Sequence, residues 1–362
     1  MRRYIKIDEK KVKKAHAVNY VEAVLTLDDW PQVKGYDFEK GLDFQHYLDS
    51  LFSTGFQATE LAKAIDIVRQ MRKTKAVIFL GYTSNMVSCG VREVIAYLVK
   101  HKLVDVLVTT AGGVEEDIIK ALKPFVIGNY DAPGGALRDK GINRTGNTFI
   151  PNDRYLYFER LMMPFLERML ALQKQHGRAM ASREFVHELG KTVKDEHSIL
   201  YWATRNDIPL FCPALTDGSI GDMVYFFKQQ HPEFLLDITD DIVEITNLAI
   251  NAKRTGIIAL GGSLPKHMIA NANLFRDGAD YAIYLTTAME YEGSNAGANI
   301  QEAMSWGNRP DAPNAKVVGD ASITFPLLVA GGFVDRQQQT PKQKSKARKG
   351  TKGKRTDVKY NS

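Results

Sequence analysis

The sequence has few cysteines and no long apolar run, and both absences limit what the protein can be. Only Cys89 and Cys212 occur among the 362 residues, which excludes a disulfide framework and suits a reducing compartment. No run of about 18 apolar residues is present, and the basic first residues are not followed by the apolar segment of a secretion signal. We therefore expect a cytoplasmic protein without membrane contact.

Three common catalytic signatures are also missing. The sequence contains no P-loop, no Gly-x-Ser-x-Gly nucleophile elbow and no spacing typical of metal ligands. It therefore gives no reason to expect a metal cofactor.

The formal net charge of +6 comes from one end of the chain. Residues 335–362 hold ten Lys and Arg against two Asp and Glu, a net charge of +8, so that the other 334 residues carry −2. This segment cannot bury a core, which predicts a disordered basic tail. A weak, salt-sensitive contact with nucleic acid and a solvated tail without a partner are both compatible with its charge.

Residues 1–40 are charged and irregular and predict an N-terminal extension, whereas residues 41–334 predict one large domain. Short apolar runs predict strands at residues 76–80, 106–108, 209–214, 234–238, 256–260, 279–286 and 316–318. Amphipathic segments between them predict helices, and this alternation indicates an α/β fold with a mostly parallel sheet covered on both faces. Residues 129–150 predict a long Gly- and Asn-rich connection, and the helix that begins near Asn152 is expected to be interrupted at Pro164.

Polar turns follow the predicted strands. The carboxyl ends of parallel strands meet at one edge of a sheet, where ligands bind, so we expect these turns to converge. They lie at residues 83–85, 110–116, 216–222, 261–267, 287–307 and 320–321. Their Gly, Ser and Thr residues suit a dinucleotide, because glycines and the first N–H groups of a helix accept phosphate. Glu116, Asp217, Asp222 and Glu302 could hold cations.

Several of these residues also have ordinary structural explanations. Glu115 and Glu116 could simply complement the dipole of the helix that they begin. His267 could act as a general base, because imidazole titrates near neutral pH, or could serve only as a hydrogen-bonded helix residue. Trp306 could stack on an alkyl ammonium chain or belong to the core. The residues alone leave these alternatives open.

Taken together, the motifs resemble the deoxyhypusine synthase family over residues 50–332. The resemblance is carried by Thr-Thr-Ala-Gly-Gly-Val-Glu-Glu-Asp at 109–117, Cys-Pro-Ala-Leu-Thr-Asp-Gly-Ser-Ile-Gly-Asp-Met at 212–223, Leu-Gly-Gly-Ser-Leu-Pro-Lys-His at 260–267, Gly-Ala-Asp-Tyr-Ala-Ile-Tyr at 278–284 and Glu-Ala-Met-Ser-Trp-Gly at 302–307. Phe-Leu-Gly-Tyr-Thr-Ser-Asn at 79–85 and Lys-Gly-Ile-Asn-Arg-Thr-Gly-Asn at 140–147 resemble the archaeal branch most.

This resemblance implies a Rossmann-like, doubly wound homotetramer that uses NAD. Such enzymes transfer the aminobutyl group of spermidine to a lysine of the hypusine-containing translation factor. By motif position, the residues that would line NAD are Ser84, Asn85, Ser88, Thr110, Ala111, Gly112, Asp217, Gly262, Thr287, Ala288, Asp320 and Ala321. Those that would meet the polyamine are Glu115, Glu116, Asp222, His267, Asn295, Glu302 and Trp306, with His267 removing a proton.

One departure from the family pattern bears directly on catalysis. Asn308 stands where the family has its imine-forming lysine, and an amide is not a nucleophile. Asn295 and Glu292 each replace an aspartate of many relatives. Three functions therefore stay open: transfer without the usual lysine, either directly or through another lysine such as Lys266; homospermidine-type transfer to a free amine; and a non-catalytic NAD-binding subunit that supports an active paralogue.

Overall fold

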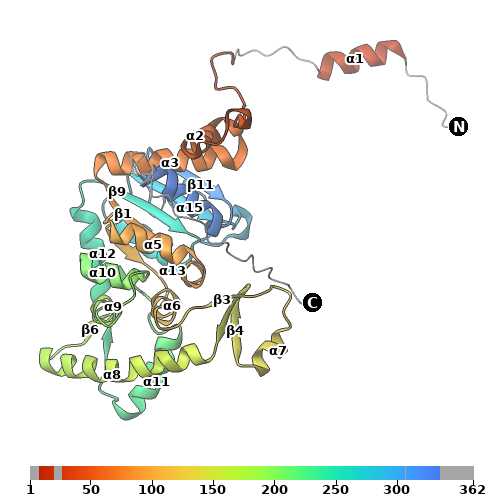
Figure 1. Cartoon of the computed structure of the whole chain (residues 1–362). Coiled ribbons are helices and arrows are strands. Elements are labelled where there is room, and N and C mark those ends of the chain that lie inside the picture. Colours follow the sequence, from red (N-terminus) through yellow and green to blue (C-terminus); the bar gives the residue numbers. More distant parts are fainter. Residues whose placement is uncertain (1–7, 20–26, 306, 335–362) are drawn as a thin grey trace, which may run out of the picture.

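The computed structural model describes residues 8–19, 27–305 and 307–334, and is organised around a six-stranded parallel sheet (Figure 1). The strands lie in the order β11-β10-β9-β1-β2-β7. Their bounds are β1 Val77–Tyr82, β2 Val106–Val108, β7 Leu210–Phe211, β9 Thr255–Leu260, β10 Tyr281–Thr286 and β11 Asn314–Val318. The predicted doubly wound α/β fold is thereby confirmed.

The chain changes direction across the sheet between β1 and β9. It runs from β1 to β2 and then β7 on one side, and afterwards fills the other side with β9, β10 and β11. β1 pairs in parallel with β9 from Val77 opposite Thr255 to Tyr82 opposite Leu260. The carboxyl ends of these two strands therefore form the switch point where doubly wound folds bind ligands.

Two buried clusters cover the two faces of the sheet, because alternate strand residues point in opposite directions. On one face, Ile78 and Leu80 belong to the larger cluster together with helices α3 (Phe56–Thr74), α5 (Val91–Lys100) and α15 (Ala321–Gly332). On the other face, Phe79 and Tyr284 pack with α12 (Asp240–Asn251) and α13 (Ser263–Leu274).

The remaining elements extend one of the two clusters or lie at the periphery. The α-helices are α1 Glu9–Asn19, α2 Phe44–Thr54, α4 Ser84–Ser88, α6 Ala111–Leu122, α7 Gly134–Asp139, α8 Asp153–His176, α9 Ser182–Gly190, α10 Ile199–Asn206, α11 Ser219–Gln230 and α14 Ile300–Ala303, and the 3-10 helices are η1 Phe38–Lys40 and η2 Glu290–Glu292. Among the helices of the described ranges, none is long and apolar enough to cross a membrane.

Four expectations from the sequence are wrong. Residues 129–150 are not a structureless connection, because they contain α7, β4 (Ile142–Thr145) and β5 (Thr148–Pro151), which pair with β3 (Val126–Ile127) as an antiparallel sheet. The strand expected at 234–238 is only β8 (Leu236–Asp237), and it pairs with β6 (Met180–Ala181) outside the main sheet. Residues 9–19 of the supposedly irregular extension form α1.

Pro164 does not interrupt its helix, which is the fourth correction. α8 continues through it, and Pro164 faces solvent while Met162 and Phe165 on either side are buried. Water can satisfy the carbonyl that loses its N–H partner, so core packing outweighs the lost hydrogen bond. The predicted basic tail at 335–362 and Trp306 lie outside the described residues.

Candidate functional site at the carboxyl edge of the sheet

The predicted turns lie at the carboxyl edge of the main sheet, because all six of its strands are parallel and end there. Neighbouring turns are joined by hydrogen bonds. The Ser84 N–H donates to Thr110 Oγ1 at 3.1 Å, and the Gly319 N–H donates to the Thr286 carbonyl at 2.9 Å. The convergence expected from the parallel fold therefore exists within a single chain.

Two predicted glycines are required by close packing against the neighbouring turns. A Cβ at Gly112 would lie 2.6 Å from Ser84 Cβ, and a Cβ at Gly262 would lie 2.3 Å from the Cα of Ala296. Within the described chain, the helices that begin here, α6 and α13, have no side-chain hydrogen bond to their N-caps. The Gly113 N–H donates to the Thr110 carbonyl at 2.9 Å and Pro265 has no N–H, so the N–H groups that could meet an anion such as a pyrophosphate are those of the first two residues of each helix.

The other predicted cofactor residues surround these helix starts. Thr83 Oγ1 donates to Asn85 Oδ1 at 2.5 Å, and the Ala288 N–H donates to Thr286 Oγ1 at 3.0 Å. Ala111 and Ala321 are the first residues of α6 and α15. Asp320 caps α15 by accepting the Ser322 N–H at 2.8 Å. Thr287 follows β10, and Asp217 precedes α11. The set therefore occupies one edge of the fold.

Glu115 has a structural role in this chain. The residue is 7% exposed, and its carboxylate accepts the Ile220 N–H at the start of α11 at 2.9 Å. A Cβ at Gly218 would lie 2.7 Å from this carboxylate, so the glycine makes room for it. Burial raises the pKa of Glu115, and the nearby charges of Asp222 and Asp217 raise it further.

Glu116, the next residue, has a different environment. Its carboxylate accepts a hydrogen bond from the Ser88 hydroxyl, so Ser88 contacts this acid in addition to lying at the predicted cofactor edge. Burial raises the pKa of Glu116 to about 7, the hydrogen bond from Ser88 and the charge of Lys120 lower it, and the charge of Glu115 raises it. Glu115 lies near Glu116 and near the exposed Asp217 and Asp222, so these four carboxylates form an acidic group suited to an ammonium ion.

A second group of polar residues lies around the start of α13. Lys266 Nζ donates to the carbonyls of Asn295 at 2.7 Å and Ala298 at 3.2 Å, and lies 4.0 Å from the centre of the Tyr284 ring. Asn308 Nδ2 donates to the Tyr284 hydroxyl at 2.8 Å. The structure therefore places Asn295 and Asn308 together with the lysine that follows the Gly-Gly turn.

His267 and Glu302 are both exposed on a single chain. His267 Nδ1 lies 3.3 Å from Asn271 Nδ2, one helical turn further along α13. The charge of Glu302 acts on Lys266, which places this carboxylate near the second group. No group of three residues that could hold a metal ion occurs in the described part of the chain.

The sequence interpretation missed Tyr284 and Asp117. Tyr284 looks like an ordinary residue of an apolar strand, but it contacts both Lys266 and Asn308. Asp117 completes the Glu-Glu-Asp triplet yet is fully buried, and it accepts from Arg92 Nε and Ser198 Oγ, both at 2.6 Å. Asp117 stands next to the apolar Ile118 on α6, and this position in the sequence could have predicted that its side chain faces the interior.

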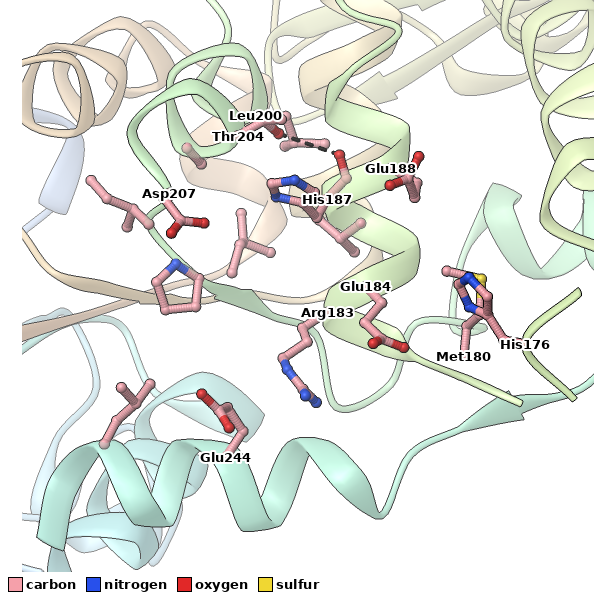
Figure 2. Close-up of a pocket in the computed structure, with 16 residues that line it drawn as sticks. His176, Met180, Arg183, Glu184, His187, Glu188, Leu200, Thr204, Asp207 and Glu244 are labelled. Carbon is pink, nitrogen blue, oxygen red and sulfur yellow. Dashed lines mark hydrogen bonds between the residues drawn. The ribbon is translucent and has the colours of Figure 1, made fainter. Parts of the chain in front are cut away.

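A cavity of about 560 Å³ lies away from this edge, between α9, α10 and α12 (Figure 2). It reaches Pro209 and Leu210 at the amino end of β7, so it is on the opposite side of the sheet from the predicted turns. Arg183 in its wall pairs with Asp240 at 2.8 Å, and Glu184 pairs with Arg178 at 2.7 Å. Since these charges are already paired, the convergent turns remain the better candidate site.

Comparisons with known proteins show the family of the chain. The family model for deoxyhypusine synthase matches residues 46–331. A protein of Pyrococcus furiosus is 55% identical over 76% of this chain and 86% of its own length, and one of Drosophila melanogaster is 44% identical over 87% and 92%; both are named probable deoxyhypusine synthase.

A solved structure gives the same assignment. It belongs to an Entamoeba histolytica protein assigned to deoxyhypusine synthase, which is 29% identical with a TM-score of 0.62 and covers 83% of this chain and 96% of its own. The chain therefore belongs to the deoxyhypusine synthase family.

Proposed function

We propose that this chain is an NAD-dependent transferase that moves the aminobutyl group of spermidine to a lysine of the hypusine-containing translation factor. The observation that carries the proposal is the composition of the carboxyl edge of the sheet. Neighbouring parallel strands are followed there by the N-termini of α6 and α13, by the acidic group and by His267. The relatives' names agree with this function, and none of those cited indicates homospermidine-type transfer.

The residues at the switch point fit a dinucleotide. The starts of α6 and α13 would receive its pyrophosphate, because Gly112 and Gly262 carry no side chain there and let Ser84 and Ala296 pack closely against the two turns. Ser84, Asn85, Thr110, Thr287 and Asp320 would line the rest of the molecule. NAD, when bound, supplies the acceptor for a hydride.

The acidic side chains would hold and orient the amine. Glu116, Asp222 and Glu302 would bind ammonium groups of spermidine, and Trp306 would pack on its methylenes. His267 would take the proton from the secondary nitrogen as the hydride leaves the adjacent carbon. These steps convert the C–N bond of spermidine to an imine, which the acceptor lysine can attack.

The exposure of His267 and Glu302 on one chain supports assembly as the expected homotetramer, in which a neighbouring copy would cover them. The low cysteine count supports the proposed cytoplasmic location. The decisive experiment incubates the protein with NAD, labelled spermidine and the translation factor, followed by mass spectrometry of the acceptor lysine. An unmodified factor together with no oxidation of spermidine would favour the non-catalytic subunit.

NAD is expected to raise the melting temperature of the full-length protein, since a ligand that binds only the native state stabilises it. At a concentration of about 100 times Kd the gain is about 2.7 kcal/mol. Thermal denaturation at increasing NAD concentration measures this, and the shift should grow with the logarithm of concentration. Absence of any shift at millimolar NAD would remove the cofactor from the proposal.

Glu116→Gln is expected to raise the melting temperature at pH 8 but not at pH 5. Because the folded pKa of Glu116 is about 7 and the ordinary value is 4.5, the folded chain keeps a proton that the unfolded chain releases between these values. Ionisation of Glu116 therefore reduces stability as the pH rises through this window, and glutamine abolishes that loss. Glu196→Gln, at a carboxylate whose side chain is 64% exposed, is the control and should show no such difference.

The same substitution tests amine binding. Wild-type protein should bind spermidine more tightly as the pH rises from about 6 to 8, because Glu116 must lose its proton to attract an ammonium ion. Calorimetric titration of Glu116→Gln should show weaker binding without this pH dependence. Equal affinities for the two proteins would exclude Glu116 from the amine site.

A further inference from the structure

Lys266 is held in an environment unlike that of a surface lysine. It lies in the first turn of α13, next to His267, and is 1% exposed. Its Nζ is enclosed by the carbonyls of Asn295 and Ala298, on the segment between β10 and α14, and by the face of the Tyr284 ring. The amine is therefore buried directly below the edge that carries the proposed substrate residues.

Tyr284 connects Lys266 with position 308. The Lys266 amine lies over its ring, and the Asn308 amide donates to its hydroxyl. Asn308 is itself 3% exposed. The Lys266 amine and the Asn308 amide therefore contact the same aromatic side chain, and of the two only the lysine can form an imine.

We propose that Lys266 carries the aminobutyl group as an imine between spermidine and the acceptor lysine. The inference rests on the proposed function, which supplies the imine of spermidine. Lys266, as the neutral amine, would attack the imine carbon through Nζ. The bond from that carbon to the 1,3-diaminopropane nitrogen would break, and the two protons that Nζ loses on forming the new imine would pass to the departing nitrogen, which leaves as a primary amine.

The second half of the transfer is the same exchange with a different amine. The acceptor lysine would attack the carbon, release Lys266, and form the final imine. Reduction of that imine would use the hydride removed from spermidine in the first step. No oxidant or reductant beyond NAD is therefore needed.

The surroundings favour a reactive amine. Burial lowers the pKa of Lys266 to about 8, the positive charge of Lys316 lowers it as well, and Glu302 opposes this change. Lys316 lies beneath the same segment and donates to the Gly297 carbonyl at 2.5 Å. Burial and a neighbouring cation are two established ways to make a lysine nucleophilic near neutral pH.

Two buried amide oxygens also indicate a site prepared for a polar ligand. Asn295 Oδ1 and Asn308 Oδ1 have no hydrogen-bond partner within the described residues. Buried polar atoms normally have partners, because an unpaired one costs free energy. Both belong to residues beside Lys266 or Tyr284, so an N–H group of a bound amine or imine could satisfy them.

Borohydride trapping tests the inference on the full-length protein with NAD and labelled spermidine. We expect a reduced aminobutyl adduct on the peptide that contains Lys266. In Lys266→Arg, which keeps the positive charge and the donors to the loop carbonyls, the adduct should fall by at least about tenfold. NADH formation, measured by absorbance in the same samples before borohydride is added, should persist in this variant.

Lys228→Arg is the matched control. Lys228 Nζ also donates to two backbone carbonyls, those of Pro232 at 3.2 Å and Phe234 at 2.6 Å. It lies near the end of α11, away from the site. Its substitution should leave the adduct unchanged.

Other results would overturn the role of Lys266, alone or together with the proposed function. NADH formation by the wild-type protein without an adduct, or with an adduct on a different lysine, would overturn the role of Lys266 and leave the proposed function standing. An undiminished adduct in Lys266→Arg would overturn it too. Failure of wild-type protein to oxidise spermidine would overturn the proposed function and this inference together.

Discussion

Asp117→Ala is expected to lower the free energy of unfolding by about 3–5 kcal/mol, the cost of breaking a buried ion pair by removing one partner. The Asp117 carboxylate is fully buried, and it accepts from Arg92 Nε and from Ser198 Oγ. It also accepts the N–H groups of Ile199 at 3.1 Å and Leu200 at 2.9 Å at the start of α10. Alanine would leave a buried guanidinium and several donors without this acceptor.

The loss is large because domains are stable by only about 5–15 kcal/mol in total. Urea denaturation followed by circular dichroism measures it. Asp66→Ala is the control: Asp66 pairs with Arg69 at 2.8 Å, but its side chain is 57% exposed, so the expected loss is below about 1 kcal/mol. Equal midpoints for the two variants would show that the buried network contributes little to stability.

The sequence predicted the central sheet well because its strands are buried on both faces. Residues of β1 such as Ile78, Phe79 and Leu80 form a short apolar run that ends at a polar turn, and the other core strands repeat this pattern. The strand order could not be read from such runs. Which strands become neighbours depends on packing between segments that are far apart in the chain.

The small antiparallel sheet was missed because its side chains give a weak signal. β3 and most of β4 are exposed, and only Thr148 and Ile150 of β5 alternate as buried residues. The glycines and asparagines around them favour turns. Backbone hydrogen bonds between β4 and β5 therefore decide the structure of this segment more than its apolar pattern does.

In the site, as in the sheet, the local sequence predicted the turns but not the tertiary contacts of their residues. Glu115, Glu116 and Asp117 look equivalent in sequence, but their carboxylates contact α11, Ser88 and Arg92 respectively. Successive residues on a helix point in different directions, so the environment of each depends on what packs around the helix. The turns could be predicted from the sequence; the separate roles of their residues could not.

His267→Ala is expected to lower the rate of spermidine oxidation by about 10²–10⁴, the usual contribution of a positioned general base. His267 follows the Gly-Gly turn in the first turn of α13 and is exposed at the carboxyl edge. Since its imidazole would act on the reacting nitrogen, kcat should fall while the NAD-induced rise in melting temperature is unchanged.

NADH formation under saturating spermidine measures this rate, and thermal denaturation with NAD measures the binding. His187→Ala is the control, because His187 lines the cavity between α9 and α10 at the far side of the sheet. Asn271→Ala should cause a smaller loss than His267→Ala, since Asn271 lies beside His267 Nδ1 and could act only by positioning the ring.

If His267→Ala reduced the rate no more than His187→Ala, His267 would be a structural residue of α13, and the base would have to be sought among the carboxylates of the acidic group. A fall in rate accompanied by loss of the NAD-induced shift would instead place His267 in the cofactor site.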